Sequence, residues 1–322
     1  MYSGLSEKGS PFLIAMNKDK ELLASFLAHA KDEDLCINHV RVVREGEVAA
    51  SFDRIRPSRF PVWSISKGFT SIAIGILRDE GLISLDERVL DIFPESIPKM
   101  YSDNLDKVTV KHLLTMTTGI EDETFFDSDE KRNSNIDLLN CFYKSRFSTP
   151  GTKWSYSSLS TYILSMIVAK RSGMDLCDYL KPRLFDKIGI KNPLWASCQA
   201  GYSYGGFGLN LSIDELSRYS ELLSKMGEYD GLRIVSREYM EEATKKNADD
   251  SPMAIDDKKN FWGYGYGYQF IMNPIEGFRS DGMYGQFAIA LPKINASVSV
   301  MSLDDRTGRI GTLLYKDIVN NL

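Results

Sequence analysis

The sequence contains few histidines and no closely spaced cysteines. All three histidines lie at or before position 112, and each stands alone, so we expect structural roles for them. The four cysteines are far apart and form no C-x-x-C pair, which indicates neither a zinc site nor a disulfide framework. We therefore expect no metal and no cofactor. The residues concerned are His29, His39, His112, Cys36, Cys141, Cys177 and Cys198.

The sequence also lacks a long hydrophobic run and an excess of basic residues. Near the N-terminus only residues 12–16 form an apolar run, and Lys8 is the one basic residue before it. This pattern predicts neither a secretory signal nor a membrane span. The formal net charge is −5 and the charges are dispersed, so we expect no nucleic-acid partner. Together these absences favour a cytoplasmic protein that acts on a small-molecule substrate.

What the sequence does contain is one strongly apolar helix that begins with reactive side chains. Residues 64–80 read SISKGFTSIAIGILRDE, and positions 69–77 are apolar nearly all round, which is typical of a buried helix. Gly81 provides a C-terminal stop. Ser64 and Lys67 are three residues apart and therefore share one face. A lysine amine enclosed by apolar surface can act as a base, so Ser64 is a candidate nucleophile.

Other serine motifs occur but lack the required context. The pattern S-x-x-K also occurs at 96–99, where Pro98 breaks a helix, and at 128–131, within an acidic polar stretch. Residues 201–205 read GYSYG and fit the G-x-S-x-G elbow of α/β-hydrolases. That fold needs a strand before Ser203 and a histidine later in the chain, and neither is present. Residues 205–208, GGFG, lack the Lys-Ser/Thr that completes a phosphate loop.

Periodicity and capping signals predict strands at both ends of the chain and helices between them. This order indicates an α+β fold, with one lobe formed by residues 1–62 and 261–322 and a mainly helical lobe formed by residues 63–260. The polar residues 121–134 are expected to form a surface loop or a lid. The alternating aromatic residues Trp262, Tyr264, Tyr266 and Tyr268 would line either an ordinary sheet face or the cleft. Helices are expected at 19–30, 64–80, 110–116, 159–171, 176–187, 212–223, 236–245 and 309–319, and strands at 40–43, 48–52, 261–272, 277–291 and 296–303.

Four segments in this order resemble the penicillin-recognising serine hydrolases. They are WSISKGFTS, VTVKHLLTMTTGI, PGTKWSYSS and a late strand with glycine. The family includes class C β-lactamases, D-alanyl-D-alanine carboxypeptidases and esterases, and the resemblance spans about residues 40–303. It implies a mostly antiparallel sheet flanked by helices, an inserted helical lobe and a site in the cleft between them.

The resemblance assigns roles to individual residues. Ser64 would be the acylated nucleophile, Lys67 its partner in proton transfer, and Tyr156 the general base. The backbone N–H groups of Ser64 and Met283 would form the oxyanion hole, and each such donor contributes about 2.7–4 kcal/mol.

The sequence departs from the family pattern in two segments that bear on the substrate. Ser158 replaces an asparagine, and Ser280-Asp281-Gly282 replaces a motif that carries Lys or His. These four residues would contact substrate. Two like charges about 4 Å apart cost on the order of 4 kcal/mol at a surface dielectric, so Asp281 disfavours the carboxylate of a β-lactam. Arg279 could neutralise Asp281 or bind an anion itself.

We therefore expect a serine hydrolase acting on a small ester or amide whose group near Asp281 is neutral or cationic. One alternative is a β-lactamase or D-Ala-D-Ala carboxypeptidase. An alternative of another class is a ligand-binding or sensor module that keeps the fold without catalysis.

Overall fold

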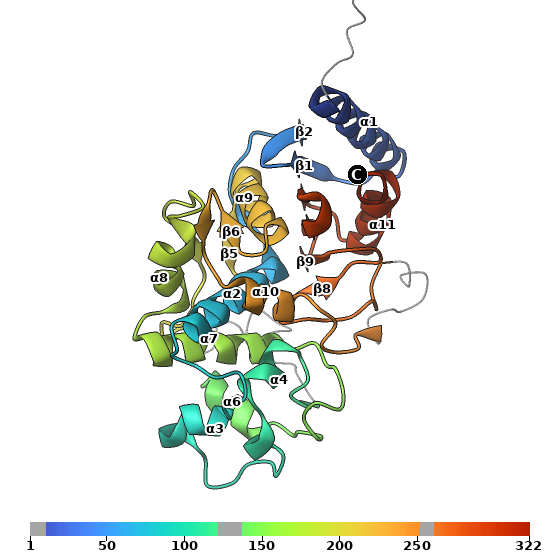
Figure 1. Ribbon diagram of the computed structural model, residues 1–322. Coiled ribbons are helices and arrows are strands. Elements are labelled where there is room, and N and C mark those ends of the chain that lie inside the picture. The colour runs from blue at the N-terminus through green and yellow to red at the C-terminus, as the bar shows by residue number, and fades with distance from the viewer. Residues whose placement is uncertain (1–10, 122–136, 252–260) are drawn as a thin grey trace, which may run out of the picture.

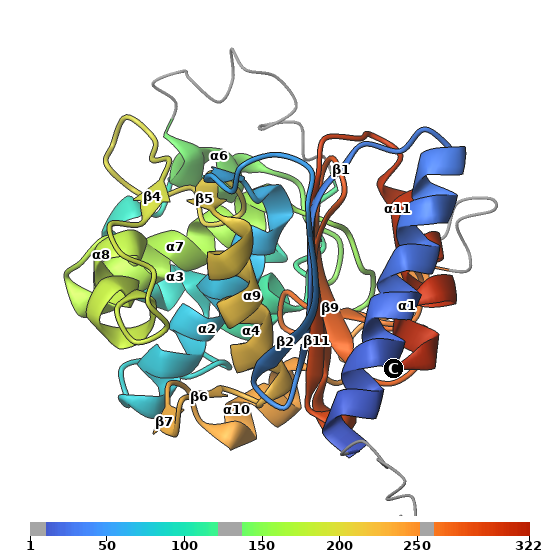
Figure 2. The same cartoon turned by 90° about the horizontal axis from the view of Figure 1, so that it is seen from above.

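The computed structural model describes residues 11–121, 137–251 and 261–322. The predicted α+β fold is confirmed: a six-stranded antiparallel sheet, in the order β2-β1-β11-β10-β9-β8, carries helices on both faces (Figures 1 and 2). The strands of this sheet are β1 (Ile37–Arg44), β2 (Glu47–Asp53), β8 (Ile271–Met272), β9 (Phe278–Gly282), β10 (Gln286–Leu291) and β11 (Ala296–Ser302).

The two ends of the chain meet in the middle of this sheet. The β1–β2 hairpin comes from the N-terminal part, and β1 pairs with β11, where Val40 lies opposite Val300. Small sheets lie outside it, formed by β3 (Phe60–Pro61), β4 (Leu194–Trp195) and β5 (Leu209–Leu211), and by β6 (Glu228–Tyr229) and β7 (Leu232–Arg233).

Alternation along β11 explains how both faces are covered. Val298 and Val300 belong to the apolar cluster formed with α1 (Pro11–Asp32) and α11 (Thr307–Asp317). Because successive side chains point to opposite faces, Ser299 faces the other side, where its hydroxyl donates to the Ser220 Oγ on α9 at 2.8 Å. Figure 2 shows α1 and α11 on one side of the sheet and α9 (Ile213–Ser224) on the other. The division at residues 62 and 261 stays a prediction, and α9 from the middle of the chain covers a sheet face.

Helices α7 (Ser158–Ser172), α8 (Leu176–Leu180) and α10 (Arg237–Ala243) pack against α2 (Ser66–Asp79), whose residues 66–77 are all buried. The all-round apolar pattern therefore corresponds to a central helix. The sequence indicates a capping box at Ser212 with Glu215 and an N-cap at Thr109, and both are present. In the structure His112 also completes a capping box with Thr109. The helices in this layer are α3 (Val89–Ile92), α4 (Val110–Leu114), α6 (Leu138–Lys144), α7 (Ser158–Ser172), α8 (Leu176–Leu180), a π-helical turn (Lys181–Phe185) and α10 (Arg237–Ala243).

Several expected elements differ from the structure. The single strand expected at 277–291 is a pair of antiparallel strands, β9 and β10, and the helix expected at 176–187 is α8 followed by the π-helical turn. The strand predicted at 261–272 is wrong except for β8, because Gly263 and Gly265, with φ of 90° and 131°, break the extended conformation. Tyr266 and Tyr268 are instead buried. The expected loop or lid at 121–134 lies, apart from Glu121, outside the described residues. Within the described part of the chain, no helix combines the length and apolar character needed to cross a bilayer.

Candidate active site

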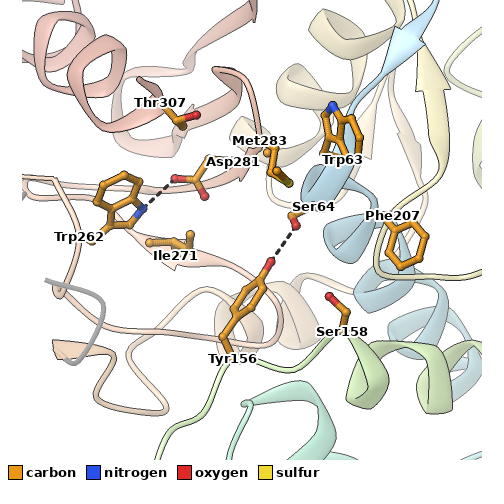
Figure 3. A pocket seen from close by; sticks show the side chains of 11 residues that line it. Trp63, Ser64, Tyr156, Ser158, Phe207, Trp262, Ile271, Asp281, Met283 and Thr307 are labelled. Carbon is orange, nitrogen blue, oxygen red and sulfur yellow. Dashed lines mark hydrogen bonds between the residues drawn. The ribbon is translucent and has the colours of Figure 1, made fainter. Parts of the chain in front are cut away.

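A cavity of about 360 Å³ lies beside the start of α2, where α7 and β9 also approach. Figure 3 shows Ser64, Tyr156 and Asp281 pointing into it from three separate segments. Its described lining combines aromatic and apolar side chains with few polar groups, which is typical of small-ligand sites. The lining residues are Trp63, Ser64, Tyr156, Ser158, Phe207, Trp262, Ile271, Asp281, Gly282, Met283 and Thr307.

Ser64 lies in a short 3-10 turn, η1 (Trp63–Ile65), that leads directly into α2. Trp63 has a φ of 50°, a left-handed conformation that costs a residue with a Cβ about 1–2 kcal/mol. Such strain persists where surrounding structure enforces it. Here the Trp63 ring packs against the Tyr284 ring, with centroids 5.4 Å apart. The strained turn holds Ser64 at the cavity wall.

Gly282 allows β9 to lie against this turn. A Cβ at position 282 would collide with the Val62 carbonyl oxygen and would lie 3.2 Å from the Trp63 Cβ. Only glycine permits this approach of the two backbones. The next residue, Met283, is 55% exposed and lines the same cavity as Ser64.

Two ionisable side chains converge on the Ser64 hydroxyl. The Tyr156 hydroxyl lies 2.8 Å from the Ser64 Oγ, and the Lys67 Nζ lies 3.2 Å from the same atom. The Lys67 Nζ is also 4.8 Å from the centre of the Tyr156 ring. Both distances to Oγ are within the range for proton transfer along a hydrogen bond. The structure therefore brings together the three residues expected to be catalytic.

Lys67 is held by three acceptors and is almost completely buried. Its Nζ donates to the Ser64 Oγ, to the Ser158 Oγ at 3.2 Å and to the Gly206 carbonyl oxygen at 2.9 Å. Three acceptors match the three N–H donors of a lysine ammonium. Ser158 therefore contacts Lys67 as well as lining the cavity.

The role of Gly206 was missed in the sequence, where residues 205–208 were considered only as a phosphate loop. A Cβ on Gly206 would lie 3.3 Å from the Lys67 Nζ. The cluster of glycines was itself the available signal, because glycine permits close approach of backbone to a functional group. Trp63, Phe207, Ile271 and Thr307 were likewise not anticipated in the cavity wall.

Asp281 is anchored at one of its two carboxylate oxygens. Its Oδ2 accepts from the Trp262 Nε1 at 3.3 Å and from the Arg279 Nε at 3.2 Å. Arg279 is fully buried; its other nitrogens donate to the carbonyl oxygens of Met272 and Phe261, and its guanidinium stacks on the Phe261 ring at 4.1 Å. Of the two roles considered for Arg279, the structure therefore shows the pairing with Asp281.

Ser280, expected to contact substrate, lies on the opposite side of β9. Its side chain is 3% exposed and is absent from the described cavity lining. A Cβ placed on Gly68 of α2 would lie 2.8 Å from the Ser280 Oγ. Because neighbouring side chains of a strand alternate between faces, Asp281 and Ser280 cannot both face the cavity. The expectation for the Ser280 side chain is therefore wrong.

The rejected elbow serine and the histidines lie away from this cavity. The Ser203 hydroxyl donates to the Asp175 Oδ2 at 2.5 Å and is buried. His112 accepts from the Thr109 N–H at 3.1 Å through its Nδ1, and burial lowers the pKa of its ring. No histidine of the described residues lines the cavity.

Known proteins share this fold and these segments. The family model described as Beta-lactamase matches residues 40–316. Penicillin-binding protein 4* of Bacillus subtilis (strain 168) is 29% identical over 140 residues, which are 41% of this chain and 30% of that protein. The 6-aminohexanoate-dimer hydrolase of Paenarthrobacter ureafaciens is 24% identical over 228 residues, 65% of this chain and 57% of the relative.

The matches therefore span less than two thirds of the length of either curated relative. A solved structure, described as a family VIII carboxylesterase, superposes with a TM-score of 0.72 at 18% identity and covers 99% of each chain. At that identity the likeness concerns the fold.

Proposed function

The chain belongs to the beta-lactamase family, and we propose that it is a serine hydrolase that acts through an acyl-enzyme on a small ester or amide. The observation that carries this proposal is the convergence of Tyr156 and Lys67 on the Ser64 Oγ, at 2.8 and 3.2 Å. Relatives named as a 6-aminohexanoate-dimer hydrolase and a carboxylesterase support hydrolysis of amides or esters.

The proposed reaction has two halves. Tyr156 would act from its phenolate form: the Ser64 Oγ attacks the substrate carbonyl carbon while its proton passes to the phenolate oxygen of Tyr156, 2.8 Å away. The backbone N–H groups of Ser64 and Met283 donate to the oxyanion. Tyr156 then returns the proton to the leaving alcohol or amine as the C–O or C–N bond breaks. Water attacks the acyl-enzyme in the same way, which releases the acid and restores Ser64.

Lys67 would act beside this proton transfer. The Ser158 hydroxyl and the Gly206 carbonyl oxygen hold the Lys67 Nζ in the position from which it donates to the Ser64 Oγ. Fixed donors of this kind need no reorganisation during the reaction. The contribution of Lys67 would therefore depend on the Gly206 carbonyl and the Ser158 hydroxyl.

The lining of the cavity favours an apolar substrate without a carboxylate. Four aromatic residues, Ile271 and Met283 make up six of the eleven described lining residues, and none of the eleven is lysine or arginine. A substrate carboxylate would therefore meet Asp281 without a cation from the wall. Pairing with Arg279 reduces this repulsion below the value of about 4 kcal/mol for a bare pair. We propose that penicillin and cephalosporin turnover is slow.

The penicillin-binding relatives keep a second candidate open, a β-lactamase or D-Ala-D-Ala carboxypeptidase. Turnover of 4-nitrophenyl butyrate, a chromogenic cephalosporin and an alanine amide should be measured side by side. Because only the cephalosporin brings a carboxylate to Asp281, we expect the ester and the amide each to have a higher kcat/KM than the cephalosporin. Fast hydrolysis of the cephalosporin alone would favour the second candidate and contradict the charge argument.

A non-catalytic binding module is the third candidate, and it is tested by the reactivity of Ser64. We expect a fluorophosphonate probe to label the protein and Ser64→Ala to abolish the label. A folded protein that takes up no probe and turns over no ester would support the binding module. Labelling that survives Ser64→Ala would place the nucleophile elsewhere.

A further inference from the structure

We infer that Asp281 is a specificity-determining residue that binds an ammonium group of the substrate, so that the substrate class is amine-bearing esters or amides with an apolar body. This inference rests on the proposed hydrolase function, because it concerns the same cavity. It goes further by assigning to one carboxylate oxygen a ligand of stated charge.

The two oxygens of Asp281 differ in their surroundings. Oδ2 accepts from both Trp262 and Arg279, whereas no described residue donates to Oδ1. The carboxylate belongs to the described cavity lining, and Figure 3 shows it directed toward the space in front of Ser64. An ionised carboxylate can accept several hydrogen bonds, so Oδ1 retains capacity for a donor that enters the cavity.

Trp262 and Arg279 fix the Asp281 carboxylate but donate only to its Oδ2. Arg279 contributes a single bond through Nε, because two other nitrogens are engaged by the carbonyl oxygens of Met272 and Phe261. The bidentate pairing that would occupy both carboxylate oxygens is therefore not formed. A carboxylate held on one side in this way is preorganised, so a ligand gains its hydrogen bond without first ordering the side chain.

The charges around the cavity favour a cation over an anion at this point. Arg279 lies behind Asp281 and is fully buried, so its positive charge is farther from a cavity ligand than the Oδ1 is. Coulomb energy falls with distance, and the nearer negative charge therefore dominates. Aromatic walls from Trp63 and Trp262 would cover the apolar body and the face of an ammonium group.

The test compares three ligands of similar shape and different charge: benzylammonium, benzyl alcohol and benzoate. Each is titrated as an inhibitor of 4-nitrophenyl butyrate turnover and, independently, by calorimetry. A charge-assisted hydrogen bond predicts that benzylammonium binds about ten- to a hundredfold more tightly than benzyl alcohol. Benzoate should bind most weakly. Equal affinity of ammonium and alcohol in the unmodified protein would overturn the inference.

Two variants test whether the preference for the ammonium ligand depends on Asp281. Asp281→Asn keeps the size of the side chain, and we expect it to reduce the ammonium-to-alcohol affinity ratio to about one. Glu276→Gln removes the same charge from an exposed turn before β9, where Glu276 pairs with Lys293 at 3.0 Å, and should keep the ratio. A ratio unchanged in a folded Asp281→Asn protein refutes the assignment. If that variant does not fold, the order of the three ligands on the unmodified protein decides.

If the protein is not a hydrolase, the same experiments give a result that differs from a failure of the Asp281 assignment. In that case the ester is not turned over and the fluorophosphonate does not label Ser64, while calorimetry still reports whether benzylammonium binds at Asp281. Conversely, ester turnover without a preference for the cation contradicts only the assignment of Asp281.

Discussion

Replacement of Tyr156 by phenylalanine isolates the role of one hydroxyl at the candidate site. The hydroxyl lies 2.8 Å from the Ser64 Oγ, and phenylalanine would remove this contact while keeping the ring. The ring contacts, to Trp154 with centroids 6.1 Å apart and to the Lys67 Nζ at 4.8 Å, need no hydroxyl. The substitution therefore tests proton transfer with little change in packing.

The expected magnitudes separate catalysis from stability. A positioned general base contributes about 10²–10⁴-fold to the rate, which corresponds to about 2.7–5.4 kcal/mol in activation free energy. Loss of one hydrogen bond from a partly exposed hydroxyl lowers the free energy of unfolding by only about 0.5–1.5 kcal/mol. We expect kcat/KM to fall at least 100-fold while the urea midpoint changes little.

The assay measures kcat/KM for 4-nitrophenyl butyrate and the rate of fluorophosphonate labelling, together with urea unfolding of each variant. Tyr264→Phe is the matched control, because Tyr264 is 37% exposed, as is Tyr156, and is absent from the described cavity lining. Its activity should stay close to that of the unmodified protein. A loss of less than tenfold in Tyr156→Phe would refute Tyr156 as the base and leave Lys67 as the candidate.

Three further predictions concern backbone approach, pH and the rejected nucleophile. Gly282→Ala should lower ester turnover at least tenfold, because its Cβ would collide with the Val62 carbonyl oxygen and displace β9 from the turn that carries Ser64. Normal turnover would show that the close contact between β9 and this turn is not needed. A hydrogen bond from Arg306 lowers the pKa of Asp304 to about 2, below the usual aspartate value of 3.8. Together with the backbone N–H groups of Arg306 and Cys36, this bond makes ionised Asp304 stabilise the fold by about 2 kcal/mol above pH 4, and the contribution is lost as the pH falls toward 2. Urea unfolding of Asp304→Asn should lack this part of the acid dependence. Ser203→Ala should keep full fluorophosphonate labelling while losing about 1 kcal/mol of stability, and loss of labelling in a folded variant would restore the elbow serine as a candidate.

Local patterns in the sequence determined much of the fold. The apolar run after Ser64 predicted the buried α2, Ser212 with Glu215 predicted a capping box, and Thr109 predicted a helix N-cap, all of which the structure contains. These features depend on residues three or four positions apart, so periodicity and capping chemistry suffice to find them. The placement of Ser64 and Lys67 on one face likewise follows from their spacing of three residues.

Segments rich in both strand formers and glycine were not predictable in this way. Residues 261–272 carry alternating aromatic side chains typical of a strand, but the left-handed glycines at 263 and 265 prevent it. Glycine permits such conformations without requiring them. Whether they form depends on packing, here the burial of Tyr266 and Tyr268.

The sequence by itself determined the class of fold and singled out Ser64 and Lys67 as the candidate nucleophile and its neighbour, because these follow from short-range spacing and from motifs. Only the tertiary structure decided what surrounds them. One of the three acceptors that hold Lys67 is the carbonyl oxygen of Gly206, 139 residues away. The orientation of β9 directs Asp281 into the cavity and Ser280 away from it. Hydrogen bonds between distant segments depend on how the sheet and helices pack, and no local pattern encodes that packing.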